Sequence, residues 1–390
     1  MRAREARRLS LALMLGLALL LSGCEDAPTT EPSTGFAGLG ESAEGFAQAR
    51  PGTPLRFPED HGPHPDHRIE WWYFTANLKD DSGEPLGLQW TLFRQALVPP
   101  AERPDPGPWV ADQLWMAHLA VSRGEQHAVA ERFARSHSQA TAEEGARGQA
   151  GAVAQPFRAW LDDWELATRV EDPDADTFER LTLTAFDGEG ENRVGYRLEL
   201  TAEGPLVLHG DEGFSQKAAD GQGSMYVSQP FWRVTGEVTL AGETHAVSGR
   251  GWLDREWSSQ LLGPAQAGWD WFSLHLDDGH RLMSFQLRGG GEAGGDYRAG
   301  TWITPEGEPR ALAPDELTLT PLATSTVAGR QVPTRWRLEV PHAELDLIVE
   351  APHANRWMDT SVPYWEGEVI ARDRETNERL GEGYLEMTGY

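Results

Sequence analysis

The chain has 390 residues, which is longer than one small domain and favours two. It carries 61 acidic and 34 basic residues, a formal net charge of -27, and this excess of negative charge argues against nucleic-acid binding. The same excess of negative charge disfavours attachment to anionic lipid through a basic patch. We expect the acidic side chains mainly on exposed faces and loops.

The first 23 residues have the pattern of a secretion signal. Arginines within residues 2–8 precede an apolar run over residues 9–21, and small residues follow up to Cys24. The run is too short for a membrane-spanning helix. Cys24, the only cysteine, stands where a bacterial lipoprotein signal places its lipidated cysteine, although an ordinary signal with an idle cysteine is the alternative. We therefore expect an exported protein of the bacterial cell envelope, lipid-anchored to the membrane at Cys24 on the periplasmic side.

Residues 24–50 are rich in small residues, proline and glutamate and have no apolar period, which indicates a flexible tether. From residue 54 onward, short segments of alternating or aromatic-rich character follow one another, separated by Asp-Gly and Ser-Gly turn signals. No long amphipathic helix is recognisable, so the sequence predicts an all-β protein. The predicted strands cover residues 70–78, 86–97, 114–122, 160–170, 180–186, 193–201, 234–240, 269–276, 281–287, 336–340, 345–349 and 365–371.

Two pairs of segments repeat one another. The hairpin that starts with residues 71–78 matches the hairpin that starts with residues 269–276, and residues 251–254 match residues 383–386. Each half thus begins and ends with an aromatic strand, so we expect the first and last strands of each half to be neighbours in a closed barrel. The predicted domains cover residues 54–262 and 263–390.

The stretch of residues 249–258 lies where the two halves meet and combines carboxylates, guanidiniums and indoles. If it forms a strand, alternate side chains point to opposite faces, and whichever face turns inward carries a charge. One face would present Trp252, Asp254 and Glu256, with Trp257 on the other. Because a buried charge must be paired or functional, this stretch is the first place to look for a site.

Seven motifs together resemble the AttH and CrtC family of exported two-domain proteins. They cover residues 60–64, 70–73, 215–217, 251–257, 268–272, 364–367 and 383–390. The resemblance implies two tandem lipocalin-like (calycin-type) antiparallel β-barrels around an apolar cavity. It leaves the activity open, because the family is similar to carotenoid 1,2-hydratases, to uncharacterised secreted hydrolases, to lipoproteins that accompany ABC-transporter permeases, and to fungal Diels-Alderases. The lipoprotein signal favours the transporter-associated branch, with an ABC-transporter permease as the expected protein partner.

Three acids among aromatic residues are the candidate catalytic groups: Asp254, Glu256 and Glu70. A carboxyl group in an apolar pocket has a raised pKa and can protonate an alkene, and aromatic faces stabilise the resulting cation. Barrel closure would bring Glu70 and Asp254 together in one cavity, where one of the two would keep its proton near neutral pH. The alternative is that Arg250 and Arg255 pair with these carboxylates as a structural clamp, since a clamp uses the same residue types.

Histidines and tryptophans supply the candidate ligand-binding residues, since the 16 tryptophans suit a cavity for a long apolar ligand. The candidates are Asp60, His61, His64, Trp71, Trp72, Tyr73, Trp252, Trp257, Trp269 and Trp271. Glycine and proline make residues 61–67 a turn, so the imidazoles there do not share one face, and we expect no metal and no cofactor. His118 is interpreted as a hydrogen-bonded core histidine and Lys217 as part of a surface ion pair.

Two functions of different classes remain open. The first is a carrier that binds an apolar or amphipathic molecule for an envelope transporter. The second is a carotenoid 1,2-hydratase-like enzyme that acts on an isoprenoid-like substrate through a carboxylic acid. No Gly-x-Ser-x-Gly motif occurs, which disfavours a serine hydrolase. The lipid anchor and the lack of a decisive catalytic set favour binding.

Overall fold

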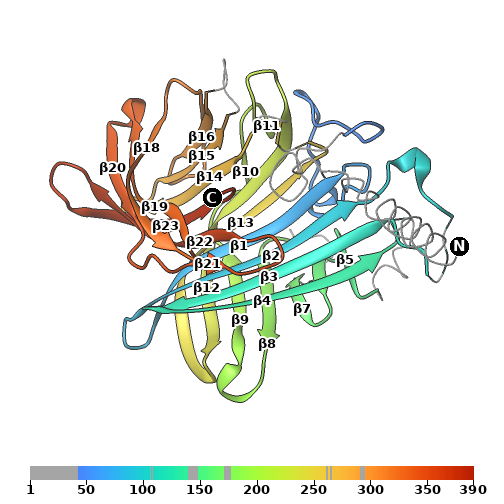
Figure 1. The fold of residues 1–390 in the computed structure, drawn as a ribbon, viewed down its shortest axis with the longest axis horizontal. Helices are drawn as coiled ribbons and strands as arrows, with labels where there is room; N and C mark the ends of the chain where they lie inside the picture. The colour runs from blue at the N-terminus through green and yellow to red at the C-terminus, as the bar shows by residue number, and fades with distance from the viewer. Residues whose placement is uncertain are drawn as a thin grey trace, which may run out of the picture. The chain divides into compact units, whose positions relative to one another are not determined.

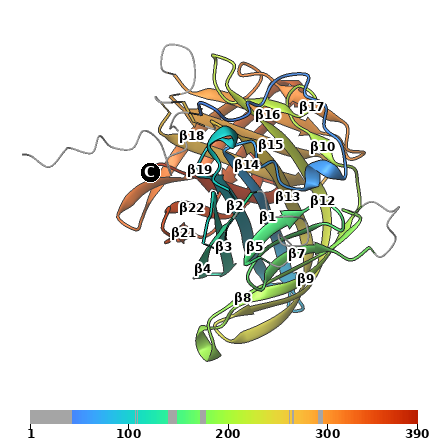
Figure 2. The same ribbon diagram turned by 90° about the vertical axis from the view of Figure 1, so that its right-hand side faces the viewer.

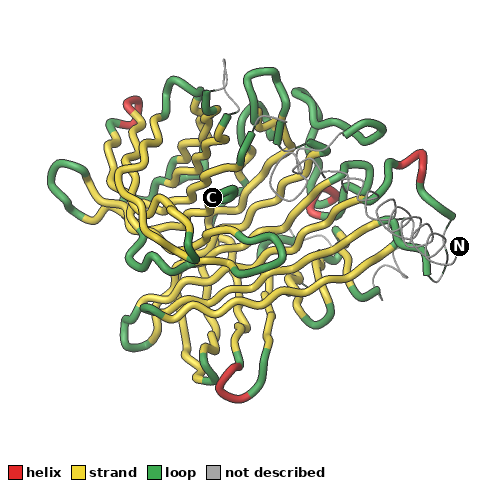
Figure 3. Tube along the Cα trace, viewed as in Figure 1, coloured by secondary structure: helices red, strands yellow, loops and turns green. Residues whose placement is uncertain are grey.

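The computed structural model describes residues 43–105, 107, 109–138, 148–170, 177–260, 262–263, 266–289 and 295–390. The predicted signal, Cys24 and the predicted tether up to residue 42 lie outside the described residues. Within the described ranges the chain is built of strands and loops, with helical turns only of the short 3-10 type (Figure 3). None of the described helices is long and apolar enough to cross a membrane.

The first of two antiparallel sheets contains the strands up to residue 258 and forms the N-terminal barrel. Its strands are β1 (Ile69–Asp80), β2 (Pro85–Ala96), β3 (Gln113–Arg123), β4 (Gln126–Ser136), β5 (Ala150–Val153), β6 (Arg158–Leu161), β7 (Trp164–Thr168), β8 (Arg180–Asp187), β9 (Val194–Ala202), β10 (Val207–Leu208), β11 (Phe214–Gln216), β12 (Gly223–Leu240) and β13 (Glu243–Ser258). The order is β4-β3-β2-β1-β13-β12-β9-β8-β7-β6-β5, with β10 and β11 paired to β12. The two ends of this path, β4 and β5, contact each other, which nearly closes the barrel.

The second sheet forms the C-terminal barrel. Its strands are β14 (Gly268–Leu276), β15 (Arg281–Arg288), β16 (Tyr297–Ile303), β17 (Pro309–Leu312), β18 (Thr318–Val327), β19 (Arg330–Val340), β20 (Leu345–Glu350), β21 (Trp357–Met358), β22 (Tyr364–Asp373) and β23 (Arg379–Met387). The order is β17-β16-β15-β14-β23-β22-β20-β19-β18, with β21 paired to β22.

The 3-10 turns are η2 (Glu59–His61), η3 (Pro100–Glu102), η4 (Gly190–Asn192) and η6 (Pro341–Ala343). The protein is therefore all-β, with two lipocalin-like barrels in tandem, as the sequence predicted.

The internal repeat is visible in the strand pairing. The first strand of each barrel forms a hairpin with the next strand, β1 with β2 and β14 with β15. It also pairs with the last strand of the same barrel, β1 with β13 and β14 with β23. The predicted pairing of first and last strands is thus confirmed in both halves.

Strand β1 is buried on both faces, which explains its continuous aromatic run. Trp72 and Phe74 point into the core of the N-terminal barrel, whereas Tyr73 belongs to a third apolar cluster between the barrels. The same third cluster contains Trp252 of β13 and Trp271 of β14. Figures 1 and 2 show β14 and β23 on the same side of β1 and β13. The two barrels therefore pack through the outer faces of their first and last strands.

Residues 43–50 differ from the predicted tether, because they pack on the folded body. The backbone N–H of Ala47 donates to the carbonyl of Asp66 at 2.9 Å, and Ser259 Oγ donates to the carbonyl of Ala47. Ala49 contacts the apolar cluster around Trp257. The last part of the predicted tether is thus part of the folded domain, because small and apolar side chains in it find a surface that the sequence alone does not show.

Candidate functional site

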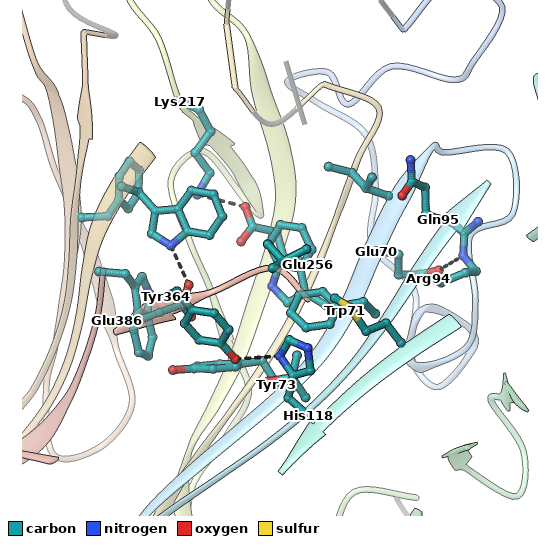
Figure 4. Close-up of a pocket in the computed structure, with 18 of the residues that line it drawn as sticks. Glu70, Trp71, Tyr73, Arg94, Gln95, His118, Lys217, Glu256, Tyr364 and Glu386 are labelled. Carbon is teal, nitrogen blue, oxygen red and sulfur yellow. Dashed lines mark hydrogen bonds and ion pairs between the residues drawn. The ribbon is translucent and has the colours of Figure 1, made fainter. Parts of the chain in front are cut away.

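A cleft lies between the two barrels, against the third apolar cluster (Figure 4). It has a volume of about 130 Å³ and is partly open to solvent. The lining is mostly aromatic and aliphatic, with a few polar groups. The lining residues are Ile69, Glu70, Trp71, Tyr73, Thr91, Phe93, Arg94, Gln95, Met116, His118, Lys217, Glu256, Trp269, Trp271, Phe285, Leu287, Val362, Tyr364 and Glu386.

The strand register explains why these side chains meet. Trp71 and Tyr73 stand opposite Glu256 and Asp254 across the β1–β13 pair, so all four point out of the N-terminal barrel. The predicted alternation of the stretch 249–258 is therefore confirmed. Of the predicted ligand-binding residues, the cleft brings together Trp71, Tyr73, Trp269 and Trp271; it also takes in two of the predicted acids, Glu256 and Glu70.

Glu256 forms a buried ion pair at one wall of the cleft. Lys217 Nζ lies 2.9 Å from Glu256 Oε1, which also accepts a hydrogen bond from Ser224 Oγ. The ammonium group lies 4.0 Å from the ring centre of Phe285 and 4.7 Å from that of Tyr226. Lys217 is only 4% exposed, so its interpretation as a surface ion pair is wrong. The error arose because the lysine lies just after the short strand β11, which carries no clear period.

Glu386 of β23 is the acid most directly placed on the cleft. Its Oε1 accepts a hydrogen bond from Trp269 Nε1 at 2.8 Å (Figure 4). Burial raises the pKa of Glu386 to about 8 against this hydrogen bond, and the nearby carboxylates Asp254 and Glu256 act in the same direction as burial. The side chain is therefore a neutral carboxylic acid at pH 7, which can donate a hydrogen bond or a proton.

Glu366 of β22 stands directly opposite Glu386 across the strand pair. Tyr73 Oη donates to Glu366 Oε1 at 2.6 Å, which joins the two barrels. Burial, reinforced by the charge of Glu386, raises the pKa of Glu366 well above its ordinary range. The close carboxyl pair that the sequence predicted in the N-terminal half thus occurs in the C-terminal half.

Asp254 lies next to the cleft but is fully covered. It accepts hydrogen bonds from Tyr226 Oη (2.6 Å), Trp252 Nε1 (2.6 Å) and Ser228 Oγ. Burial nevertheless raises the pKa of Asp254 to about 7. Tyr226 Oη in turn accepts from Trp271 Nε1 at 2.9 Å, and this bond connects Asp254 to the cleft wall.

Glu70 borders the cleft, but in the strand register its side chain belongs to the other face of the same sheet from those of Trp71 and Glu256. It stands opposite Trp257 in the β1–β13 pair, and its carboxylate lies 2.8 Å from Arg94 Nε and 2.9 Å from Arg255 Nη2. Figure 4 shows it bound to Arg94 and apart from Glu256. Burial alone would raise the pKa of Glu70, but the two guanidiniums hold it well below its ordinary range. The prediction that Glu70 and Asp254 lie together in one cavity is therefore wrong. Asp254 pairs with Tyr73, which is three residues from Glu70 along β1, and an odd separation places the two side chains on opposite faces of the sheet. Glu70 instead forms the clamp with Arg255 that was the alternative.

The predicted histidines do not line the cleft, and only His64 contacts Glu70. His64 Nδ1 lies 2.7 Å from Glu70 Oε1, its Nε2 lies 3.0 Å from Asp60 Oδ1, and its ring stacks on Trp257 at 3.8 Å. His61 is fully buried and stacks on Phe178 at 3.5 Å, and burial lowers its pKa to about 3. Among the described residues, no group of three or more acidic, histidine or cysteine side chains is arranged to hold a metal ion.

Trp72 and Trp252 have structural contacts. Trp72 lies in the core of the N-terminal barrel, where Arg255 packs over its ring at 3.9 Å, and Trp252 lies in the cluster between the barrels. His118 is buried as expected, with ring nitrogens 2.9 Å from Tyr364 Oη and 3.1 Å from Glu131. It also borders the cleft, because Tyr364 reaches it from the opposite barrel.

Sequence reasoning missed the C-terminal acids Glu366 and Glu386 as site residues. A signal was available for Glu386, because the repeat aligns it with Asp254. No comparable signal existed for Tyr226 or Ser228, which acquire their partners only when β12 pairs with β13.

A tandem pair of lipocalin-like barrels with an aromatic cleft between them defines the class of this protein. The profile of the AttH-like family matches residues 48–390, and the chain belongs to that family. No curated protein matches the chain.

Three solved structures resemble the chain over most of its length. One is a protein described as an AttH from Nitrosomonas europaea, with 32% sequence identity and a TM-score of 0.73, covering 88% of this chain and 99% of the other. A second is kievitone hydratase from Nectria haematococca, at 15% identity and a TM-score of 0.59, covering 88% and 98%. The third is CghA with Sch210972, at 13% identity and a TM-score of 0.52, covering 90% and 97%. At their low identity, the last two share only the fold with this chain.

Proposed function

We propose that the protein binds an apolar or amphipathic small molecule in the cleft between its barrels. The observation that carries this proposal is the lining of the cleft, in which indole, phenol and phenyl rings from both barrels surround a space with few polar groups. Rigid aromatic walls bind apolar ligands with little loss of side-chain entropy. The polar points, Glu386 and the Lys217–Glu256 pair, would orient a ligand that carries one polar group.

Trp71 and Trp269 offer the sharpest test, because they occupy equivalent positions in the two barrels and both line the cleft. Binding of the uncharged apolar fluorophore N-phenyl-1-naphthylamine should weaken about tenfold in Trp71→Ala and in Trp269→Ala, through loss of buried aromatic area. Trp302, a partly exposed tryptophan that stacks on His280 and does not line the cleft, is the control. If Trp302→Ala weakens binding as much as the cleft variants, the fluorophore binds elsewhere and the proposal fails.

A second candidate function, acid-catalysed hydration of a carbon–carbon double bond, is favoured by Glu386. A neutral carboxylic acid on an aromatic cleft can transfer its proton to an alkene carbon, and the ring faces stabilise the resulting carbocation. Water would then add to the cation and return a proton to the carboxylate. Kievitone hydratase shares this fold, which is compatible with such chemistry but assigns none here.

Glu386→Gln separates the two candidates. Glutamine keeps the shape and the acceptor for Trp269 but cannot give up a proton. The protein is incubated with the isoprenoid alkene squalene in D2O, and deuterium and oxygen incorporation are measured by mass spectrometry. An enzyme should lose at least a hundredfold in rate in Glu386→Gln while fluorophore binding persists. Absence of incorporation with the unmodified protein would leave binding as the function and reject hydration of this substrate class.

We also propose that the protein is exported and held to the membrane by a lipid on Cys24, with its barrels on the periplasmic side and an ABC-transporter permease as partner. The signal pattern before Cys24 supports the anchor. Cys24→Ser should release the protein from the membrane fraction or block its maturation. Co-purification of a permease with the wild-type protein, but not with Cys24→Ser, would support the partner; unchanged membrane fractionation of the variant would contradict the anchor.

A further inference from the structure

A second pocket lies on the outer face of the C-terminal barrel, the face that also borders the cleft. It has a volume of about 470 Å³ and is bounded by the sheet face of β15 to β17 and by the segment 210–216 of the N-terminal barrel, which includes β11. Met283, Ala299, Thr301 and Leu312 are among the residues of the sheet that line it. Because Thr301 pairs with Met283 and Ala299 with Phe285, these four side chains share one face of the sheet, whereas Leu312 pairs with Gly300 and belongs to the other face.

Strand β15 runs under both pockets. Its successive side chains on this face are Leu287, Phe285 and Met283. Leu287 lines only the cleft, Met283 lines only the second pocket, and Phe285 lines both. Leu287 and Met283 are four residues apart, about 13 Å along the strand, and Phe285 at the midpoint lines both pockets, so the two pockets adjoin at this side chain.

Phe285 is held in place from the side of the N-terminal barrel. Lys217 Nζ lies 4.0 Å from the centre of its ring, and Lys217 directly follows β11. Lys217 itself is fixed by Glu256 at 2.9 Å. The boundary between the two pockets is thus one aromatic side chain with an ion pair packed against it, and the sheet face continues beneath that boundary.

We propose that the cleft and the second pocket are two parts of one channel for an elongated alkyl chain, and that Phe285 limits how far that chain can extend. The proposal rests on the proposed function, since it concerns the ligand of the same cleft. The channel follows a strand between a sheet face and a covering segment, which suits an unbranched chain better than a rigid ring system. Phe285 is then a residue that determines specificity for ligand length.

The test uses the full-length protein and a homologous series of straight-chain alcohols from hexanol to tetradecanol, which displace N-phenyl-1-naphthylamine. With the wild-type protein, affinity should increase about fourfold for each added methylene until the chain reaches Phe285, and then level off. In Phe285→Ala the increase should continue to longer alcohols. Leu287→Ala, a control within the cleft, should weaken all alcohols and leave the length limit unchanged.

A double variant makes the test specific. Ala299 is partly exposed, so Phe285→Ala combined with Ala299→Phe refills the second pocket and should restore the wild-type length limit. An unchanged limit in Phe285→Ala, with alcohol binding intact and a cooperative thermal transition, overturns the single channel and leaves the proposed function standing. Failure of the wild-type protein to bind the fluorophore or any alcohol overturns both.

Discussion

Three acids at or next to the cleft show how neighbours, rather than residue type, set a protonation state. Glu70 is fully buried, yet Arg94 and Arg255 hold its pKa well below the ordinary range. Asp254 is also buried and Glu386 is partly buried, but their hydroxyl and indole partners carry no positive charge, and their pKa values rise to about 7 and about 8. At neutral pH, Glu70 is therefore a structural anion, whereas most Glu386 side chains keep their proton.

Glu70→Gln should destabilise the protein by about 3 to 5 kcal/mol, because it leaves two buried guanidiniums without their carboxylate. Since the folded-state pKa is lowered, the contribution of Glu70 is present above its unfolded value of 4.5 and is lost as the pH falls through the lower folded value. Urea unfolding at neutral pH measures the loss. Glu237→Gln, at an exposed position of β12, should change stability by less than about 0.5 kcal/mol. Equal effects of the two variants would contradict the role of Glu70 as a clamp.

Asp254 affects the pH dependence of stability with a sign opposite to that of Glu70. Asp254→Asn should remove this effect. The folded pKa of about 7 exceeds the unfolded value of 3.8, so the wild-type protein loses stability as the pH rises between these values, by about 4 kcal/mol in total. Asparagine resembles the protonated acid and does not titrate, so the variant should show a flatter profile over this range. Thermal unfolding scans across the range measure the difference, and parallel profiles would show that Asp254 is ionised in the folded protein.

At the scale of single elements, the sequence predicted what depends on local pattern. Alternation placed Asp254 and Glu256 on one face of β13, and the repeat identified the hairpins that start both barrels. It also anticipated that first and last strands pair, because each half begins and ends with aromatic strands. These features are local or periodic, so one sequence suffices.

What sequence could not predict depends on which strands meet. Residues 160–170 were predicted as one strand but form the hairpin of β6 and β7, with Asp162 in a left-handed conformation at φ 55°. Strand β4 was missed because most of its side chains are partly exposed, and its one large apolar residue, Phe133, is 44% exposed. The contact of Lys217 with Phe285 and the bond of Tyr73 to Glu366 join elements from opposite barrels, and no periodicity encodes such contacts.

Gly383 shows how closely β23 approaches β14. A Cβ atom added there would overlap the backbone carbonyl oxygen of Ser273, which cannot move without breaking the pairing of the two strands. We expect Gly383→Ala to cost about 1 to 3 kcal/mol, measured by urea unfolding. Gly263→Ala is the matched control, because a Cβ atom at Gly263 meets only ordinary contacts at 3.5 Å or more. A Gly383→Ala protein as stable as the control would show that β23 does not lie this close to β14.

At the scale of the whole molecule, the candidate site belongs to neither barrel alone. The N-terminal barrel contributes Trp71 and Glu256, and the C-terminal barrel contributes Trp269 and Glu386. Polar bonds join the barrels around the cleft: Asn77 Nδ2 donates to the carbonyl of Gly383 at 3.0 Å, among others. A duplicated barrel thereby gains a site that one copy lacks, and this explains why the first and last strands, which face the other barrel, carry the aromatic motifs.

Tyr73→Phe tests this dependence of the site on the contact between barrels. The change removes the hydroxyl that donates to Glu366 Oε1 at 2.6 Å inside the buried contact between the barrels. A buried polar group that loses its partner costs about 1 to 3 kcal/mol. Because Glu366 lies opposite Glu386, we also expect weaker binding of N-phenyl-1-naphthylamine in the cleft.

The control for this prediction is Tyr297→Phe, the same chemical change at a residue of the C-terminal barrel that lines only the second pocket. It should leave both the melting temperature and fluorophore binding close to those of the wild-type protein. If Tyr73→Phe lowers the melting temperature but leaves binding unchanged, the bond stabilises the barrel contact without shaping the cleft. If it changes neither, the bond of Tyr73 to Glu366 contributes nothing to the barrel contact, and the placement of Glu366 and Glu386 must depend on β22 and β23 rather than on Tyr73.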